Sequence, residues 1–512
     1  MCKSGFKKIY RRLFMSNSKK ILSGILALTM TAGLAACSSG DDTGAGGNAG
    51  GGGAEATTTQ ETAPTTTAAT VAINEEGLKE GEDEVLANAM SQLRDAELEN
   101  NEVKWLAHYD LNPSTNGASK SVGLEMFEQK YGGTLKYYAT TWENRYNDLS
   151  TYVLGGEGID IFPGDDVYNF PKGIVNGMFQ PIDNYVDLNS SIWQNVKAGM
   201  EAYAFGGKHF NMVTSVTAEE IVIYNKATIE ANGLDDPWEL YKEGNWNWDT
   251  FKSMLQDFVD EDNDQWGLDG FWAETALFLS AGVPTVGTTD DGQLVCNLND
   301  ATVEKAMNYQ YDLFNDGLVF PREQFSWNEQ PQFMGEGRQL FYIIGPYALD
   351  GAPETWSHKI EPENVGVAPI PSPANSTPYH VAKINGYALC KGASNPEGAA
   401  LFAECYVVGS VDEGAIAISD RKKKDDSKLS DEIIANLKEI DEIARKNPVV
   451  DLASGCSTDI ASYTTQGGDN IGMRAALHGT EWASNREAIA DTIILLVDEV
   501  NTELQNKVAE LS

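Results

Sequence analysis

The residues with the clearest potential for chemistry are aromatic side chains that stand beside polar groups. Trp142 lies at the expected start of a helix, and Asp165 and Asp166 lie just past an expected strand. Trp272 and Tyr347 each follow a glycine-containing turn. Ligands of open parallel sheets bind at the carboxyl ends of the strands. A sugar ring stacks its apolar face on an indole or phenol while its hydroxyls bond to carboxylates. Each aromatic alone is equally consistent with core packing, so only the joint pattern indicates a carbohydrate site.

Signatures of catalysis and of metal binding are missing from the sequence. It contains no G-x-S-x-G, no H-E-x-x-H and no Walker A loop. The five histidines lie far apart, without metal-ligand spacing: His108, His209, His358, His380 and His478. The acidic run 260–264 has Gln265 and Phe271 where a calcium loop needs Gly and Glu, so we expect an acidic turn. We expect no catalytic residue, no metal and no cofactor.

The N-terminal residues 19–37 have the pattern of an export signal. Lys19 and Lys20 precede an apolar run that ends in small residues at Cys37. The run is too short for a membrane-spanning helix. Residues 1–36 are therefore interpreted as a signal peptide, with Met15 as an alternative start. Leu34-Ala35-Ala36-Cys37 resembles the lipobox of bacterial lipoproteins, and the resemblance implies a diacylglycerol on the Cys37 thiol.

Four further cysteines lie in the body of the chain: Cys296, Cys390, Cys405 and Cys456. None forms a C-x-x-C pair, so a zinc or thioredoxin-like site is not indicated. Disulfides are permitted outside the cell, but a domain of this size does not need them. We expect buried free thiols.

Charge and composition divide the 512 residues into a tether and a globular part. The net charge is −39, and such an acidic surface repels phosphate backbones, which argues against a nucleic-acid partner. Residues 38–70 are rich in Gly, Ala, Ser and Thr and cannot form a core, so residues 37–102 are expected to be a flexible, then acidic, tether. Within it, residues 73–102 read as a loose helix or solvated spacer. About 410 residues remain, enough for two domains.

The globular part begins with alternating strands and helices. Strands are expected at 103–107, 135–138 and 159–162, with helices at 121–131 and 142–154 between them. This order is typical of an α/β fold with mostly parallel sheets. Further strands are expected at 221–225, 339–344, 364–369 and 384–390. Helices are expected after a cap at Asp249, at 301–315, at 395–407 and at 481–511, the last closing the second lobe. The run Lys422-Lys423-Lys424 is interpreted as a solvated face.

Several short motifs, taken in order, resemble those of the extracellular solute-binding proteins of ABC sugar importers, the family that includes maltose-binding protein. They are Gly158-Ile159-Asp160-Ile161-Phe162, Ile223-Tyr224-Asn225-Lys226, Trp248-Asp249-Thr250-Phe251, Phe333-Met334-Gly335-Glu336-Gly337, Gly345-Pro346-Tyr347, Gly386-Tyr387-Ala388-Leu389 and Asn395-Pro396-Glu397-Gly398-Ala399. The resemblance covers residues from 103 to the C-terminus. It implies a two-lobed α/β fold with hinge crossovers, residues 103–213 and 368–416 forming lobe 1 and 214–367 and 417–512 forming lobe 2.

The resemblance also implies a site and partners. A sugar would lie between the lobes, and an ABC permease would receive it from a monomeric protein anchored by lipid at the extracellular face of the membrane. The residues expected to bind the ligand are Asp110, Trp142, Asp165, Asp166, Trp272, Tyr347, Asn385 and Gly386. Near Asp469-Asn470 this chain lacks an aromatic that the maltose binder has, which leaves the identity of the sugar open.

Two alternatives stay open at this point. The first is a lipoprotein glycoside hydrolase, which would need two carboxyl groups about 5 to 10 Å apart across a cleft. The second is a binder of a non-sugar solute such as a peptide or metal complex, although the sequence shows no clustered metal ligands.

Overall fold

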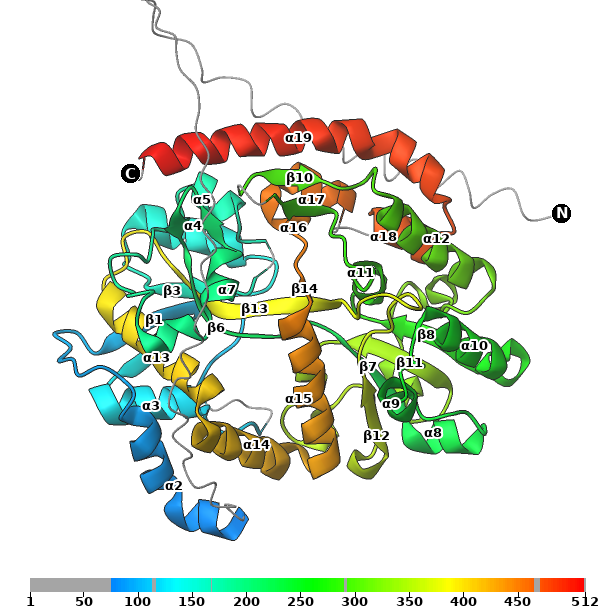
Figure 1. Cartoon of the computed structure of the whole chain (residues 1–512), viewed down its shortest axis with the longest axis horizontal. Helices are drawn as coiled ribbons and strands as arrows, with labels where there is room; N and C mark the ends of the chain where they lie inside the picture. Colours follow the sequence, from blue (N-terminus) through cyan, green and yellow to red (C-terminus); the bar gives the residue numbers. More distant parts are fainter. Residues whose placement is uncertain (1–74, 113–116, 167, 290–291, 465–469, 511–512) are drawn as a thin grey trace, which may run out of the picture. The chain divides into compact units, whose positions relative to one another are not determined.

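The computed structural model describes residues 75–510 apart from 113–116, 167, 290–291 and 465–469. The expected signal peptide, Cys37 and the first part of the tether lie outside these residues. Two sheets, each with helices packed on it, organise the described part of the chain (Figure 1). The fold is mixed α/β, as expected from the order of elements in the sequence.

Six of the described strands form the first sheet, in the order β14-β13-β3-β1-β2, with β6 paired to the other edge of β13. Their bounds are β1 Glu102–Ala107, β2 Thr134–Ala139, β3 Ile161–Pro163, β6 Asn211–Ala218, β13 His380–Leu389 and β14 Pro448–Val449. Strands β1, β2 and β3 are parallel, whereas β13 runs antiparallel to β3 and β6. The expected parallel core of the first lobe is confirmed, with an antiparallel strand added beside it.

Four of the described strands form the second sheet, in the order β12-β7-β11-β8. Their bounds are β7 Ile221–Asn225, β8 Trp266–Gly270, β11 Gln339–Ile344 and β12 Val365–Ala368. Only β8 and β11 are parallel, and β7 is antiparallel to both of its neighbours. Two small hairpins complete the strands: β4 Ala204–Phe205 with β5 Lys208–His209, and β9 Val286–Thr288 with β10 Leu294–Cys296.

The helices cover both sheets. The longer ones are α2 Glu75–Met90, α3 Val122–Tyr131, α4 Arg145–Gly155, α10 Trp248–Phe258, α12 Ala301–Asn315, α13 Pro396–Val411, α14 Glu413–Ser427, α15 Asp431–Lys446 and α19 Trp482–Glu510. The shorter ones are α5 Lys172–Val175, α6 Ser191–Gln194, α7 Lys197–Glu201, α8 Lys226–Ala231, α9 Pro237–Lys242, α11 Ala273–Leu279, α16 Ala453–Cys456, α17 Thr458–Thr464 and α18 Ile471–Ala476.

Side-chain caps mark the N-terminal ends of several of these helices. Ser121 caps α3 and Asn395 caps α13, because their side-chain oxygens accept backbone N–H groups of the first turn. The expected cap at Asp249 is wrong. The Asn247 side chain instead accepts from the N–H groups of Asp249 and Thr250, and α10 starts at Trp248. Asn247 and Asp249 are both good capping residues, and the sequence pattern alone did not show which of them accepts the free backbone N–H groups of the first turn.

The acidic run 260–264 forms a short 3₁₀ turn, η1 Glu261–Asn263, closed by Asp264 in the left-handed region at φ 56°. No group of metal-ligating side chains occurs in the described part of the chain. Cys390, Cys405 and Cys456 are buried free thiols and Cys296 is half-buried, so the expectation of free thiols is confirmed.

Helix α2 corrects the interpretation of residues 73–102 as a solvated spacer. The helix packs on α14, α13 and α3, and Leu86, Ala89 and the following Leu93 are buried in the main hydrophobic core. Acidic residues on its other face concealed this apolar stripe in the sequence.

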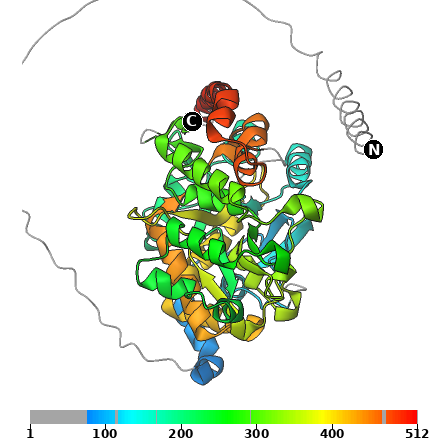
Figure 2. The same cartoon turned by 90° about the vertical axis from the view of Figure 1, so that its right-hand side faces the viewer.

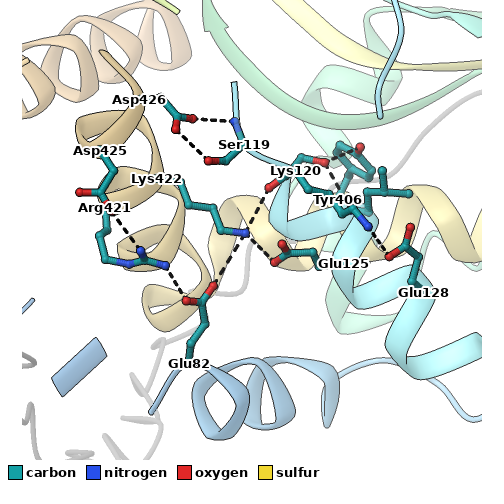
Figure 3. A network of polar contacts seen from close by, with 12 residues as sticks. Glu82, Ser119, Lys120, Glu125, Glu128, Tyr406, Arg421, Lys422, Asp425 and Asp426 are labelled. Atoms are coloured by element: carbon teal, nitrogen blue, oxygen red, sulfur yellow. Dashed lines mark hydrogen bonds and ion pairs between the residues drawn. The ribbon is translucent and has the colours of Figure 1, made fainter. Parts of the chain in front are cut away.

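Ion pairs reinforce the docking of α2, as Figure 3 shows. Glu82 of α2 lies 2.5 Å from Nη2 of Arg421 and 3.7 Å from Nζ of Lys422, both on α14. Lys422 also pairs with Glu125 of α3 at 2.6 Å. The lysine run is therefore not a solvated face: Lys423 and Lys424 pair with Asp350 and Asp431 as well.

The C-terminal helix α19, which was expected to close the second lobe, also contacts an element beside the first sheet. It packs along β10, α12, α17 and α18, and its C-terminal end reaches α5 beside the first sheet (Figure 1). Figure 2 shows the same helix nearly end-on, above the rest of the described fold. Its buried residues repeat at helical spacing, from Ile489 through Ile493 and Val500 to Leu504.

A first prediction concerns the docked tether helix. Leu86 is 2% exposed, so Leu86→Ala should lower the free energy of unfolding by about 2–4 kcal/mol through lost burial and a cavity. Glu84→Ala, on the exposed face of the same helix, serves as the control and should change it little. Chemical denaturation measures both. Equal stability of the two variants would contradict the docking of α2 on the core.

A second prediction concerns pH. Burial lowers the pKa of His380 to about 4, and its neutral ring bridges the crossover between β12 and β13. Nε2 accepts the N–H of Ile370 at 3.3 Å, and Nδ1 lies 2.9 Å from the Val381 carbonyl oxygen. As the pH falls below about 6.5, the pKa of a histidine in the unfolded chain, His380 takes up a proton in the unfolded chain but stays neutral in the folded protein. Stability is then lost at about 1.4 kcal/mol per pH unit.

The variant His380→Gln removes this titration. Its stability should therefore fall less steeply than that of the wild type between about pH 6.5 and about pH 5. Denaturant midpoints across this range measure the two slopes, and His478→Gln, at an exposed position, is the control. Parallel curves for wild type and His380→Gln would show that His380 does not stay neutral in the folded protein.

Candidate ligand-binding site

A cavity of about 110 Å³ lies where the two sheets are joined. One wall is Trp142, in the turn before α4, together with Asp165 after β3. The opposite wall is Trp272 with Thr275 and Leu279 of α11. The remaining lining residues come from strands β13 and β14, from α16 and from loops: Tyr203, Glu219, Glu220, Val381, Ala382, Lys383, Ile384, Val449, Val450, Asp451 and Ser454.

Trp142 is fixed by a buried ion pair beneath it. The Arg145 guanidinium lies 3.5 Å from the centre of the indole ring and also donates to the Trp142 carbonyl. Its Nε lies 2.5 Å from Oδ2 of Asp166, and both side chains are almost fully buried. With one face of the indole covered by Arg145 and 41% of the residue exposed, the ring is held ready to stack on a ligand.

Trp272 is fixed in a similar way. Gly270 adopts φ 146°, and a Cβ there would lie 2.0 Å from the Ile343 carbonyl oxygen, so only glycine allows this turn. Arg322 donates to the Gly270 carbonyl and pairs with Asp269 at 2.7 Å. Burial raises the pKa of Asp269 to about 6, although Arg322 opposes the shift.

Glu219 and Glu220 form the link between β6 and β7, and therefore between the two sheets. The Glu219 N–H donates to the Val381 carbonyl at 3.1 Å, which ties this crossover to β13. Lys383 of β13 projects to Asp165, with 2.8 Å between Nζ and Oδ2. Residues from the β6–β7 link, from β13 and from the loop after β3 thus converge at one point.

Burial and mutual charge shift the pKa values of Glu219, Glu220 and Lys383. Burial raises the pKa of Glu219, while the charge of Lys383 opposes the shift. The pKa of Glu220 is raised well above its usual range, by burial and then by the charge of Glu219. Burial works to lower the pKa of Lys383, but Glu219 and Asp165 outweigh it, so the ammonium form is favoured.

The structure brings some of the expected ligand-binding residues together and separates others. Trp142, Asp165 and Trp272 line the cavity, whereas Asp166 lies behind Trp142 as the partner of Arg145. Tyr347 lies in η4 Pro346–Leu349, is 61% exposed and does not line the cavity. Its pKa is raised by burial and then by the charges of Glu220 and Glu219.

Three expected residues have other surroundings. Asp110 accepts from the backbone N–H and side-chain amide of Asn112 in a local turn. Asn385 lies within β13, not in a loop, and donates to the hydroxyls of Ser215 and Thr217. At Gly386 a Cβ would lie 2.6 Å from the Met212 carbonyl oxygen, so this glycine permits close pairing of β13 with β6.

Several lining residues were missed in the sequence: Tyr203, Glu219, Glu220, Lys383 and Asp451. The adjacent glutamates before an expected strand were the available signal, but acid pairs are common in a chain with 76 acidic residues. Asn470, near the position where an aromatic was lacking, caps α18, and Asp469 lies outside the described residues.

A larger cavity, of about 1120 Å³, is lined by residues of α7, α14 and α15, of strand β6 and of the β9–β10 hairpin. No aromatic side chain is among its described lining residues, and its charged groups include paired side chains such as Lys438 with Asp420. Aromatic rings and convergent polar groups are features of small-molecule sites. We therefore take the smaller, tryptophan-lined cavity as the candidate site.

Comparison with known proteins defines the class of this chain. The model of the family of bacterial extracellular solute-binding proteins matches residues 112–407, more than half of the sequence. The chain belongs to this family, whose members are binding proteins. No helix in the described ranges combines the length and apolar character needed to span a bilayer.

Solved structures share the fold. An ABC substrate-binding protein of Listeria monocytogenes in complex with cycloalternan is 15% identical, with a TM-score of 0.54, over 76% of this chain and 99% of that one. The GacH receptor of Streptomyces glaucescens, solved unliganded and with acarbose, is 14% identical, with a TM-score of 0.55, over 77% and 98%. A solute-binding protein of Thermotoga lettingae bound with α-D-tagatose is 16% identical, with a TM-score of 0.52, over 79% and 100%.

These similarities confirm the two-lobed α/β fold that the sequence motifs implied. A search of curated protein sequences finds no match to this chain.

A third prediction tests the support of Trp142. Arg145→Met leaves the Asp166 carboxylate buried without its partner, which should destabilise the protein by about 3–5 kcal/mol. The double variant Arg145→Met with Asp166→Leu removes both charges and should recover much of that loss. Thermal and denaturant unfolding of the two variants measure this. A single variant as stable as the wild type would show that the pair does not hold this wall.

Proposed function

We propose that this chain captures a carbohydrate outside the cell and delivers it to the permease of an ABC importer. The observation that carries the proposal is the cavity between the sheets, where Trp142 and Trp272 face a shared space with Asp165 and the crossover glutamates. Flat rings stack on sugar faces, and carboxylates accept sugar hydroxyls. The complexes of the structural relatives with cycloalternan, acarbose and tagatose support the same ligand class.

Ligand capture would work by closure of the two lobes. Trp142 lies on the first sheet's side and Trp272 on the second sheet's side, so a ligand that contacts both favours the closed arrangement. Only a few segments join the sheets, among them the links β6–β7 and β12–β13, which can act as the hinge. The expected lobes were 103–213 with 368–416, and 214–367 with 417–512. Because β6 continues in the first sheet to Ala218, we place the first boundary at the link formed by Glu219 and Glu220 instead of after residue 213.

The proposal includes a lipid anchor and a monomeric receptor. A diacylglycerol on Cys37 would hold the protein at the extracellular face of the membrane, since two acyl chains anchor stably. The tether then raises the local concentration of loaded receptor near the permease. Metabolic labelling with a fatty acid, compared between wild type and Cys37→Ser, tests the anchor.

A hydrolase is the alternative, because several carboxyl groups line the cavity. We propose binding without turnover, since the family consists of binding proteins, Asp165 is paired with Lys383, and Asp451 accepts backbone N–H groups. Chromatography of oligosaccharides after incubation with the protein distinguishes the two. Shortened products would favour the hydrolase.

A fourth prediction tests the site. Trp272→Ala removes one stacking wall and should weaken binding of an oligosaccharide by about 10- to 100-fold, as expected for the loss of an aromatic contact of about 1.5–3 kcal/mol. The matched control is Trp327→Ala, because Trp327 is 49% exposed and does not line the cavity. Calorimetry against a panel of oligosaccharides measures both. Unchanged affinity in Trp272→Ala would remove Trp272 from the site.

A further inference from the structure

We propose that the carbohydrate bound in this cavity carries a protonated amino group, and that Glu220 is the residue that selects it. This inference rests on the proposed function and names the ligand class for the same site. It requires an amino sugar, or an oligosaccharide that contains one, in place of a neutral sugar.

The charges that line the cavity do not balance. Four carboxyl groups face it, from Asp165, Glu219, Glu220 and Asp451, against the single ammonium group of Lys383. Lys383 is already paired with Asp165. A ligand that brings a positive charge would compensate the excess next to the buried Glu220, where a charge pair is stronger than in bulk water.

The partners of the acidic groups single out Glu220. Asp451 accepts the backbone N–H groups of Thr285 and Val286 at 2.9 and 3.0 Å, so it serves the fold. Glu220 is 5% exposed, and its Oε2 is buried without a hydrogen-bond partner among the described residues. Such a buried, unpaired carboxyl oxygen is costly unless a ligand pairs with it.

The aromatic side chains near Glu220 favour the same chemistry. Trp272 lines the cavity beside it, and the charge of Glu220 contributes to the raised pKa of Tyr347. Electron-rich ring faces attract ammonium groups as well as apolar sugar faces. A neutral hydroxyl could donate one hydrogen bond to Glu220, but it brings no positive charge to stabilise the carboxylate form of Glu220.

Proton coupling follows from the same geometry. Burial and the charge of Glu219 raise the pKa of Glu220 well above its usual range, Lys383 opposes this shift, and Glu274 of α11 adds to it. Tyr347 faces the same group from η4. The raised pKa favours the protonated, neutral form of Glu220 in the empty site. When an ammonium group binds, the Glu220 proton leaves to solvent, and a carboxylate–ammonium pair forms.

The experiment uses calorimetry to compare two ligands with the same sugar backbone: a β-linked glucosamine tetramer, which carries ammonium groups, and its fully N-acetylated counterpart, which carries neutral amides. We expect the wild type to bind the amine form at least about tenfold more tightly, a difference of about 1.4 kcal/mol. Glu220→Gln should weaken the amine form by about 10- to 100-fold, as for a buried hydrogen bond to a charged group, and leave the N-acetylated form within about twofold. Glu323→Gln, at an exposed position outside the cavity, is the control for net charge.

A second measurement needs no variant. Binding of the amine form to the wild type, measured in two buffers of different ionisation enthalpy at a pH below the pKa of the ligand amines, should release a proton, and affinity should rise with pH until those amines begin to lose their protons. It keeps the test decisive if Glu220→Gln unfolds, which thermal melting reports.

The outcomes separate the two proposals, with maltotetraose included as a neutral ligand. Equal or tighter binding of the neutral ligands, or binding of the amine form without proton release, overturns the selection of an amine by Glu220 and leaves sugar capture standing. Failure of every carbohydrate, charged or neutral, to bind overturns the proposed function and this inference with it.

Discussion

Two buried arginine–aspartate pairs hold the parts of the site in place. Arg145 with Asp166, and Arg322 with Asp269, each fix a backbone carbonyl in a turn that presents a cavity tryptophan. A buried guanidinium paired with a carboxylate resists displacement because either charge alone would be costly to bury. Both walls are therefore rigid before any ligand arrives, which reduces the entropy lost on binding.

The connections between the sheets decide what lies between those walls. Strand β6 pairs with β13 along most of its length, so the link to β7 and the start of β13 must run side by side. That pairing places Glu219 and Glu220 beside Lys383, although more than 160 residues separate them along the chain. In the proposed mechanism, the hinge and the polar part of the site are the same segments. Ligand charge and closure would then be coupled through one set of contacts.

Packing at the ends of the chain limits how the lobes can move. Helix α19 spans from α12 and α18 to α5, so its contacts connect elements beside both sheets. Helix α2 is held to α14 and α3 by Leu86 and by the ion pairs of Glu82. The first described helix is thus held to the rest of the described fold by burial and charge.

The sequence by itself determined the class of fold, most of the elements and two walls of the site. These are local features: the alternation of strands and helices, caps such as Ser121, and the glycine turn before Trp272. Local features depend on residues close together in the sequence, so they can be predicted from it. Only the tertiary structure decided that Asp166 supports Trp142, that Asn385 and Gly386 serve strand pairing, and that Glu220 is a buried acid with an unpaired oxygen. Burial and charge balance depend on neighbours distant in the chain, and no spacing of residue types records which of many similar carboxyl groups the fold will remove from water.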